Sequence, residues 1–307
     1  MVAEVVLHSI LPPVRSADFL VRPYVAASSS SSAACGRSSS LLLRLRPRPR
    51  PTRLRAPAGA LRSLASMSPE SPLVHDVCAS AVTAGVALGL LRFWEELAKR
   101  GVFEQKLNRK LVHISIGLAF MLFWPLFSSG SRAPFLAAVA PGINAIRMVL
   151  MGLGILRNDA MVKSMSRHGD YRELLKGPFY YACTITLATS IFWRTSPIGI
   201  AAICNLCAGD GMADIIGRRF GHHKLPYNPN KSIAGSLAMV FAGFIASVGY
   251  MHYFHSFGFV NESWGMAMRF FFVSLAAAFV ESLPISSQLD DNLTVPFTSL
   301  LFAGLVF

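Results

Sequence analysis

Charged side chains are scarce in this sequence. Asp, Glu, Lys and Arg make up 15% of its 307 residues, whereas roughly 25% is usual for a soluble domain. Hydrophobic residues reach 53%, and the mean hydropathy is +0.47. Five cysteines are too few for a disulfide-rich secreted scaffold of this length. The composition therefore excludes a soluble globular protein, a wholly disordered chain, a coiled coil and a disulfide-stapled secreted domain.

Acidic residues are few, and the basic residues are unevenly placed. The chain has 16 acidic and 29 basic side chains, so its formal net charge is +13. Residues 1–66 contain ten arginines, no lysine and only Glu4 and Asp18 as acids. Serine and proline are also frequent there, as in the run from Ser28 to Ser32. Such a segment cannot bury enough apolar surface to fold by itself.

An N-terminus rich in Arg and Ser and poor in acids is typical of an organellar transit peptide. The serine runs favour a chloroplast over a mitochondrion, and we expect cleavage at about residues 55–70. The alternatives are an RNA-binding arm or a disordered tail. No aromatic residue lies among the arginines of residues 44–55, so the base-stacking side chains of an RNA-binding arm are missing. We predict a transit peptide over residues 1–66, a mature domain over residues 67–307 and no nucleic-acid partner.

Several catalytic signatures are absent. The sequence contains no GxxxxGK[ST] phosphate loop, no protein-kinase motif set, no HExxH and no GxSxG. Cys204 and Cys207 have CxxC spacing, but there is no second pair and no adjacent histidine cluster. We expect these two cysteines to be packing residues rather than zinc ligands. If a nucleotide binds, another architecture must hold it.

Long apolar stretches recur from residue 72 onward and alternate with short polar loops. A bilayer core requires about 20 apolar residues per helix. Repetition of this pattern favours membrane helices over the core helices of a large soluble protein. We predict an all-α, polytopic membrane protein with about seven to eight transmembrane helices. The expected spans are residues 72–91, 111–127, 133–154, 178–195, 196–216, 232–253, 265–284 and 292–307.

The basic residues of the predicted membrane domain gather on one side. Loops 1, 3 and 5 between the expected spans carry fifteen Lys and Arg residues, whereas loops 2, 4 and 6 carry only Arg132 and Arg194. By the positive-inside rule the basic loops face the equivalent of the cytoplasm, which is the stroma in a plastid. This basic surface either sets the topology and attracts anionic membrane lipids, or binds a water-soluble polyanion beside a lipid-soluble substrate.

Residues 205–236 combine carboxylates, glycines and bases. Asp210 and Asp214 are four residues apart, so they share one face of a helix. Carboxylates at membrane depth are costly and mark functional sites. Paired carboxylates also suit Mg²⁺, which takes oxygen ligands and commonly bridges substrate phosphates. The alternative is that these acids pair with Arg218 or Arg219.

The other polar and glycine residues of this segment are typical of a phosphate site. Glycines let the backbone approach a phosphate closely, basic side chains neutralise it, and N–H groups at a helix start favour anions. The segment therefore predicts a nucleotide and metal site. Its candidate nucleotide- and phosphate-binding residues are Asn205, Gly209, Gly211, Gly217, Arg218, Arg219, Lys224, Lys231, Ser232 and Ser236.

A second cluster precedes the second expected span. Arg109 and Lys110 could bind phosphate. His113 lies one helical turn past Arg109 and is either a proton carrier or an ordinary hydrogen-bonding residue. Asn144 and Arg147 lie inside the third span, where a buried Arg requires an anionic partner from the protein or a ligand.

A third cluster spans the last polar loop. Glu281 falls inside an expected span, and Asp290 and Asp291 follow in the loop on the basic side. An acid at membrane depth is a functional candidate. The two aspartates either bind a metal ion or complement the charge of the neighbouring loops.

Four stretches of the sequence resemble the polyprenol kinase family: RKLVH at 109–113, NLCAGDGMADIIGRRFG at 205–221, NKSxAGS at 230–236 and VES…DDNLTVP at 280–296. The family includes phytol, farnesol and dolichol kinases and a fungal CTP-dependent diacylglycerol kinase. The resemblance implies a plastid-membrane enzyme that transfers the γ-phosphoryl group of CTP, or of UTP, to phytol or a related prenyl alcohol from the bilayer. It also implies a role in salvaging phytol for tocopherol synthesis.

An in-line phosphoryl transfer gives roles to particular residues. We expect Asp210 and Asp214 to hold Mg²⁺, with Asp290 and Asp291 as weaker metal candidates. The candidates for the general base are Glu281, Asp214 and His113. By resemblance, Arg109 and Lys110 match the family's basic pair. Asp210 and Gly217 match its glycine–aspartate region, and Lys231 and Ser232 match its lysine–serine element.

Other classes remain open. A farnesol or geranylgeraniol kinase would differ only in its acceptor. A UbiA-type membrane prenyltransferase also uses DxxxD spacing, but a second such motif is not visible, and it would depend on a prenyl diphosphate. A CDP-alcohol phosphotransferase would have an Arg where Asp214 stands. A transporter with a midplane ion site would show inverted repeats, and no clear internal repeat is present.

Overall fold

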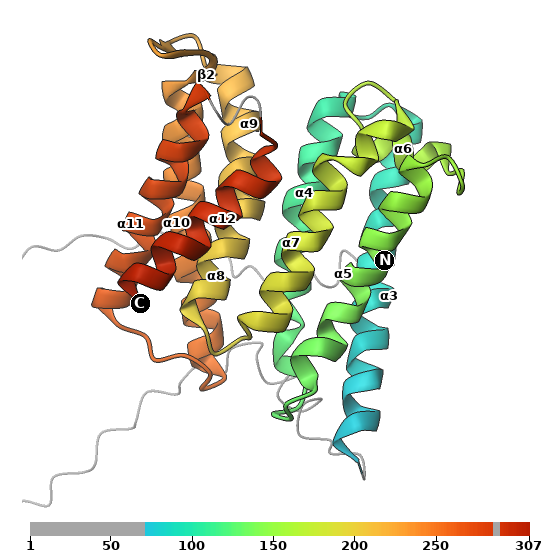
Figure 1. Ribbon diagram of the computed structural model, residues 1–307, viewed down its shortest axis with the longest axis vertical. Helices are drawn as coiled ribbons and strands as arrows, with labels where there is room; N and C mark the ends of the chain where they lie inside the picture. Colours follow the sequence, from blue (N-terminus) through green and yellow to red (C-terminus); the bar gives the residue numbers. More distant parts are fainter. Residues whose placement is uncertain (1–70, 285–288) are drawn as a thin grey trace, which may run out of the picture. The chain divides into compact units, whose positions relative to one another are not determined.

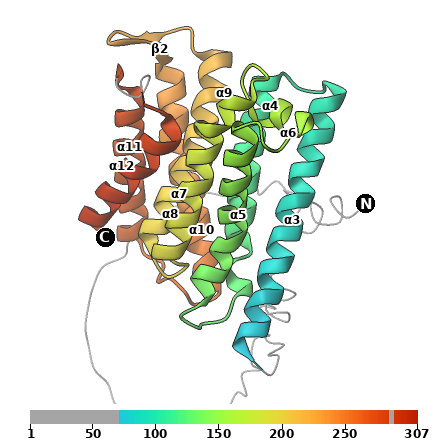
Figure 2. The same cartoon turned by 45° about the vertical axis from the view of Figure 1, so that its right-hand side comes forward.

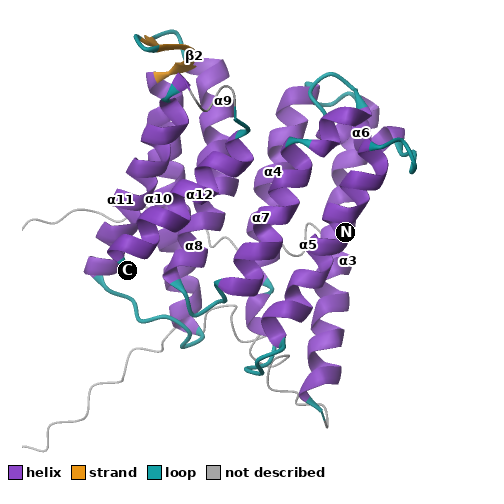
Figure 3. Cartoon of the chain, in the orientation of Figure 1, coloured by secondary structure: helices purple, strands orange, loops and turns teal. Residues whose placement is uncertain are grey.

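Helices make up most of the described chain. The computed structural model describes residues 71–284 and 289–307 (Figure 1). The predicted transit peptide and its cleavage region lie outside these residues. Within the described residues, one short antiparallel hairpin of β1 and β2 accompanies the helices (Figure 3). The predicted all-α class is confirmed.

The helices follow one another with short connections. Every expected span falls on a helix, although some boundaries differ by several residues. The elements in chain order are α3 (Pro72–Arg100), α4 (Gln105–Leu122), η1 (Trp124–Leu126), α5 (Ala133–Gly152), α6 (Asp159–Met165), η2 (Tyr171–Leu175), α7 (Gly177–Ile191), α8 (Pro197–Cys204), η3 (Asn205–Gly209), α9 (Asp210–Phe220), β1 (Lys224–Leu225), β2 (Asn228–Ser232), α10 (Ile233–Ser256), α11 (Trp264–Ser282) and α12 (Asp291–Val306).

Six helical segments of the described chain are long and apolar enough to cross a membrane. They are α3, α4 extended through η1, α5, the continuous segment α8–η3–α9, α10 and α11. The expected spans at 178–195 and 292–307 form the shorter helices α7 and α12, of 15 and 16 residues. The structure is consistent with the expected polytopic architecture.

Local sequence explains where helices begin and end. The Ser71 hydroxyl accepts a hydrogen bond from the N–H of Val74 at the start of α3, and that helix stops at Gly101, whose φ is +66°. The Ser232 hydroxyl accepts from the N–H of Gly235 at the start of α10, at 3.2 Å. These caps satisfy backbone groups that have no partner inside the helix.

The segment α8–η3–α9 is the centre of the described bundle (Figure 2). In the apolar 18-residue stretch of this segment 78% of the residues are buried, whereas in that of α3 only 17% are buried. It packs against α4, α10 and α12. The turn η3 is π-helical, and π-turns inside α-helices occur frequently at functional sites. Here the turn directly precedes Asp210, which begins α9.

The outward faces of the helices are apolar. Trp124, Phe254 and Phe270 are fully buried in the core, whereas Phe135 and Phe279 on the outside are each 62% exposed. Similar side chains cover the outside of the other long helices. An apolar surface of this extent suits lipid acyl chains rather than water. Polar side chains therefore lie mainly at the ends and in the interior of the helix bundle.

Candidate active site

A polar cavity of about 710 Å³ is lined by residues of the β1–β2 hairpin and of the helix ends beside it. Figure 1 shows where this hairpin lies in the bundle. Residues of α4, α9, β2, α11 and α12 form its walls. Segments separated by more than a hundred residues in sequence thus meet in one place. The predicted site residues that line it are Arg109, Lys110, Asp210, Asp214, Gly217, Arg218, Lys224, Lys231, Ser232, Glu281, Asp290 and Asp291.

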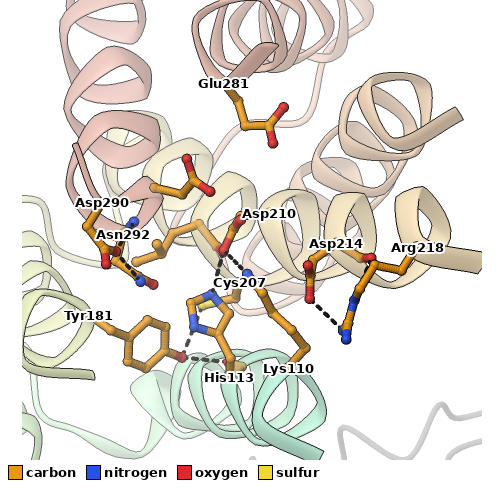
Figure 4. A network of polar contacts seen from close by, with 12 residues as sticks. Lys110, His113, Tyr181, Cys207, Asp210, Asp214, Arg218, Glu281, Asp290 and Asn292 are labelled. Carbon is orange, nitrogen blue, oxygen red and sulfur yellow. Dashed lines mark hydrogen bonds and ion pairs between the residues drawn. The ribbon is translucent and has the colours of Figure 1, made fainter. Parts of the chain in front are cut away.

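Asp210 and Lys110 form a buried ion pair at the base of the cavity (Figure 4). The Nζ of Lys110 lies 2.7 Å from Oδ2 of Asp210, and the residues are only 4% and 2% exposed. The Nε2 of His113 is 3.5 Å from the same carboxylate oxygen. A buried charge is tolerated when a partner of opposite sign compensates it. Lys110 and His113 of the predicted basic cluster and Asp210 of the predicted carboxylate segment therefore belong to one site.

Asp214 lies one helical turn beyond Asp210 on the cavity side of α9. Its Oδ2 accepts a hydrogen bond from Arg218 at 2.7 Å. Both side chains are about one-third exposed. The two aspartates share a helix face, as their spacing predicts, and Asp214 adopts the pairing with Arg218 that the sequence left open.

Lys231 brings a second cation to the cavity from β2. Its Nζ pairs with Glu281 of α11 and, at 3.2 Å, with Asp291 of α12. Burial disfavours the charged form of Lys231, but the carboxylates of Asp291 and Glu281 outweigh burial and raise its pKa to about 12. Lys231 is therefore a fixed positive charge at neutral pH.

Asp290 caps α12 and holds Asn292. Its Oδ1 accepts from the backbone N–H of Asn292 at 3.0 Å and from the side-chain amide of Asn292 at 2.6 Å. Within residues 71–284 and 289–307, His, Cys, Asp and Glu side chains form no group of three or more that could hold a metal ion. Any ion bound here would need further ligands, such as substrate phosphates or water.

Cations outnumber acids around the polar cavity. Eight Lys and Arg residues line it, against five Asp and Glu residues. A cleft with an excess of one charge concentrates ligands of the opposite sign. Lys106, Arg167 and Lys176 belong to this lining but were not among the predicted site residues. The asymmetry of loop charge placed them on the same side as the other basic loops, but it could not show that they converge.

The predicted glycines have two kinds of surroundings. A Cβ atom at Gly211 would collide with Ile114 of α4, and one at Gly209 would contact Met239 of α10. These two glycines permit close packing of helices and lie outside the cavity lining. Gly217 does line the cavity, where α9 approaches the start of α10.

Four other predicted residues lie outside the polar lining. Asn205 is fully buried, and its side-chain amide atoms have no hydrogen-bond partner among the described residues. Arg219 is exposed on α9. The Ser236 hydroxyl is buried in α10, also without a partner in the described part of the chain. His113 lines a separate groove.

An apolar groove of about 270 Å³ lies beside the polar cavity, between α3, α4, α5 and α7. Arg109 lines both. The remaining wall is largely aliphatic and aromatic, with His113, Asn144, Arg147 and Asn292 as polar exceptions. Residue patterns on single helices gave no signal for this groove, because four helices build it together.

His113 has a fixed orientation in the groove wall. Its Nε2 is 2.8 Å from the carbonyl oxygen of Leu206. A carbonyl only accepts, so the neutral ring carries its proton on Nε2 and leaves a lone pair on Nδ1. The hydroxyl of Tyr181 donates to the carbonyl oxygen of His113 at 2.7 Å, which also holds this part of α4 (Figure 4).

Comparison with known proteins identifies the family. The chain is 75% identical over 244 residues to a protein of Oryza sativa subsp. japonica named probable phytol kinase 2, chloroplastic, a match that covers 79% of this chain and 80% of the relative. It is 65% identical to probable phytol kinase 3, chloroplastic, of Glycine max, over 78% and 76% of the two chains. It is 59% identical to farnesol kinase, chloroplastic, of Arabidopsis thaliana, over 82% and 83%. The chain belongs to the chloroplast phytol and farnesol kinase family.

The family membership confirms the resemblance to polyprenol kinases. No protein-family model and no solved structure matches this chain. The four stretches that carried the resemblance, residues 109–113, 205–221, 230–236 and 280–296, all contribute to the walls of the polar cavity. In this chain the four stretches therefore meet at one site.

Proposed function

We propose that this protein is a prenyl alcohol kinase that transfers the γ-phosphoryl group of CTP to phytol and so forms phytyl phosphate. The observation that carries the proposal is the junction of two unlike cavities at Arg109. A polyanion suits the cation-rich cavity, and an apolar chain suits the groove beside it. The names of the relatives support phosphorylation of a prenyl alcohol. CTP as donor, with UTP as alternative, follows from the resemblance of the motifs.

The polar cavity is the proposed nucleotide site. Arg109, Lys110, Arg218, Lys224 and Lys231 would neutralise the phosphates, as phosphoryl transfer requires. The start of α10 at Ser232 adds backbone N–H groups beside the same cavity.

The carboxylates of α9 fit a magnesium ion. Asp210 and Asp214 are hard oxygen donors on one helix face in the cavity wall, and Mg²⁺ commonly takes one or two carboxylates plus substrate phosphates. We propose these two residues as its protein ligands, with Asp290 and Asp291 as the second candidate pair. When bound, the ion would neutralise charge on the transferred phosphoryl group.

The reaction is an in-line displacement at the γ-phosphorus. The acceptor oxygen forms a new bond to phosphorus, the bond to the β–γ bridging oxygen breaks, and CDP leaves. The hydroxyl proton passes to a base. Of the three candidates, Glu281 and Asp214 line the polar cavity and pair with cations, whereas His113 lines the groove with its Nδ1 lone pair free of the Leu206 contact. We propose His113 as the base.

A second candidate acceptor is farnesol. The chain is 59% identical to a protein named farnesol kinase, and geranylgeraniol shares the same chemistry. These alcohols differ from phytol in chain length and saturation, not in the reacting group. The charged residues of the cavity therefore do not distinguish them.

A phosphorylation assay tests the proposal. Membranes that contain the full chain receive labelled CTP, Mg²⁺ and phytol, with UTP and ATP as other donors and farnesol and geranylgeraniol as other acceptors. We expect label in lipid-extractable phytyl phosphate. Absence of lipid label from inserted protein with every donor would contradict the kinase, and the same membranes would then be tested with a prenyl diphosphate for the UbiA-type activity.

We further propose a plastid location with the nucleotide site facing the stroma. The relatives are named as chloroplast proteins, and the cavity lies at the end of the bundle formed by the basic loops. Stromal CTP would then reach the cavity from water while the alcohol arrives from the bilayer. In this setting the product would serve phytol salvage for tocopherol synthesis.

A further inference from the structure

We propose that the apolar groove is the acceptor site: it holds the prenyl chain along α4, and Arg109 and Asn292 bind the hydroxyl group at its polar end. This inference rests on the proposed kinase function and adds to it the place of the acceptor and the residues that orient it. Asn292 was not assigned a role from the sequence, and Arg109 was assigned only to phosphate binding.

The groove has the size and lining of a site for a single chain. Along α4 it extends from Arg109 to Phe120, roughly 16 Å at 1.5 Å per residue. Its volume of about 270 Å³ lies just below the range of pockets for drug-sized ligands. A slender single-chain lipid fits this volume better than a two-chain lipid.

The rim of the groove reaches the outer surface of the bundle. Leu88 of α3 and Ile143 of α5 belong to its lining and are 48% and 54% exposed. Exposed aliphatic side chains at this place face the acyl chains of a bilayer. A prenyl alcohol can therefore enter sideways from the membrane without crossing water.

Unpartnered polar atoms mark the polar end of the groove. The Nε of Arg109 and the Oδ1 of Asn292 are buried, and neither has a hydrogen-bond partner among the described residues. Asn292 is 3% exposed. Burying such groups without partners is costly. A hydroxyl group has one donor and accepts as well, so in the bound alcohol it can accept from Arg109 and donate to Asn292. Rotation about the C–O bond then turns the same proton toward the base for the transfer.

The polar end adjoins the nucleotide cavity. Asn292 donates its side-chain N–H to Asp290 at 2.6 Å, and Asp290 lines the polar cavity. Gly177, at the start of α7, also lines the groove, and a Cβ atom there would lie 3.1 Å from the Asn292 amide and 3.4 Å from Asp290. A hydroxyl held between Arg109 and Asn292 is thus at the boundary that a γ-phosphoryl group would approach.

The small side chain of Ala84 lies toward the opposite end, where the groove reaches Phe120. Ala84 of α3 lies nearly two turns farther from the basic end of the helix than Leu91, and both line the groove. Filling the far end should shorten the longest chain that fits, without touching the nucleotide cavity. Acceptor length, and so the choice between phytol and shorter alcohols, would be set here.

The first test compares Ala84→Phe with Ala81→Phe in the full chain. Ala81 is exposed on the same helix and does not line the groove, so its variant is the matched control. We expect Ala84→Phe to lower kcat/KM for phytol by about tenfold relative to farnesol, with KM for CTP unchanged. Ala81→Phe should leave the ratio as in the wild type. Equal ratios in all three proteins would overturn the groove assignment.

Asn292→Leu tests the hydroxyl end. It should lower kcat/KM for every prenyl alcohol by at least roughly a hundredfold, since the hydroxyl loses its acceptor, while KM for CTP stays the same. A purely structural role would lower thermal stability and affect both substrates. Wild-type activity toward all alcohols would overturn the role of Asn292.

Photolabelling separates failure of the groove from failure of the kinase function. Detergent-solubilised full chain is irradiated with a diazirine analogue of farnesol, and labelled residues are mapped by mass spectrometry. We expect label on α3, α4 and α5 within the groove, reduced by excess phytol. Kinase activity with label elsewhere would overturn the groove and leave the function intact. Groove label without activity toward any alcohol would support the lipid site and contradict the kinase.

Discussion

At the scale of single residues, the site depends on charges that are buried in pairs. Lys110 and Asp210 come from helices a hundred positions apart. The net stability of such a pair is small, because desolvation offsets the attraction, whereas removal of one partner leaves an uncompensated charge. We therefore infer that the Lys110–Asp210 pair serves mainly to hold the Asp210 carboxylate in place at the base of the cavity.

Lys110→Met should destabilise the protein by about 3–5 kcal/mol, because Asp210 then stays buried without its cation. Adding Asp210→Leu should recover much of that loss, since two apolar residues replace the pair, while activity remains absent. Thermal unfolding in detergent and the kinase assay measure the two effects. A double variant no more stable than Lys110→Met would contradict this account of the pair.

Asp214 differs from Asp210, since its ion pair is partly exposed and local. An i,i+4 pair on a helix contributes only about 0.3–0.5 kcal/mol. Asp214→Asn should therefore unfold almost as the wild type does, yet require at least roughly tenfold more Mg²⁺ for half-maximal rate. Arg218→Gln breaks the same pair and keeps the carboxylate, so its Mg²⁺ requirement should be no higher. An unchanged Mg²⁺ requirement in Asp214→Asn would show that Asp214 is not a ligand of the metal ion.

At the scale of elements, the central segment α8–η3–α9 decides the geometry. The π-turn Asn205–Gly209 sits in the most buried span of the described chain. Asp210 and Gly211 follow it, one facing the cavity and the other packed against α4. Close approach of α4 and α9 is what brings Lys110 to Asp210.

Gly211→Ala should force α4 and α9 apart, because the new methyl group would collide with Ile114. We expect a loss of about 1–3 kcal/mol in the free energy of unfolding and reduced activity. Adding Ile114→Ala should restore part of both. As a control, Gly85→Ala meets no atom within 4 Å and should be neutral or stabilise α3 by up to about 1 kcal/mol. Equal effects of the two glycine substitutions would contradict the packing role.

At the scale of the whole molecule, the described bundle is asymmetric in charge along the membrane normal. The basic loops, the β1–β2 hairpin and the polar cavity share one end, and apolar side chains cover the flanks. The proposed reaction needs this arrangement, because its two substrates come from different phases.

Accessibility of introduced cysteines tests the proposed orientation. In a Cys78→Ser background, His222→Cys on the hairpin side should be protected from an impermeant maleimide in intact chloroplasts and labelled after lysis. Labelling in intact chloroplasts would contradict a stromal nucleotide site. Ser131→Cys lies at the other end: labelling in intact organelles would place the protein in the inner envelope, and labelling only after detergent would place it in the thylakoid.

Much of the fold could be predicted from residue patterns. The apolar runs determined the helices, because a backbone in lipid must satisfy its hydrogen bonds internally. They did not show that residues 196–216 form the centre of the bundle, or that 178–195 and 292–307 give helices too short to meet the usual length of a span. Helix ends depend on caps and on packing, which a run of apolar letters does not specify.

The sequence by itself determined the all-α membrane class, the basic side and most of the residues in the polar cavity, because hydropathy, loop charge and carboxylate spacing are local properties. Only the tertiary structure decided which base meets which acid. It alone joined Lys110 to Asp210 and Lys231 to Glu281 and Asp291, and moved Gly209 and Gly211 from the cavity to helix contacts. The groove with Asn292 was also visible only in the tertiary structure, because helices distant in sequence create it when they pack.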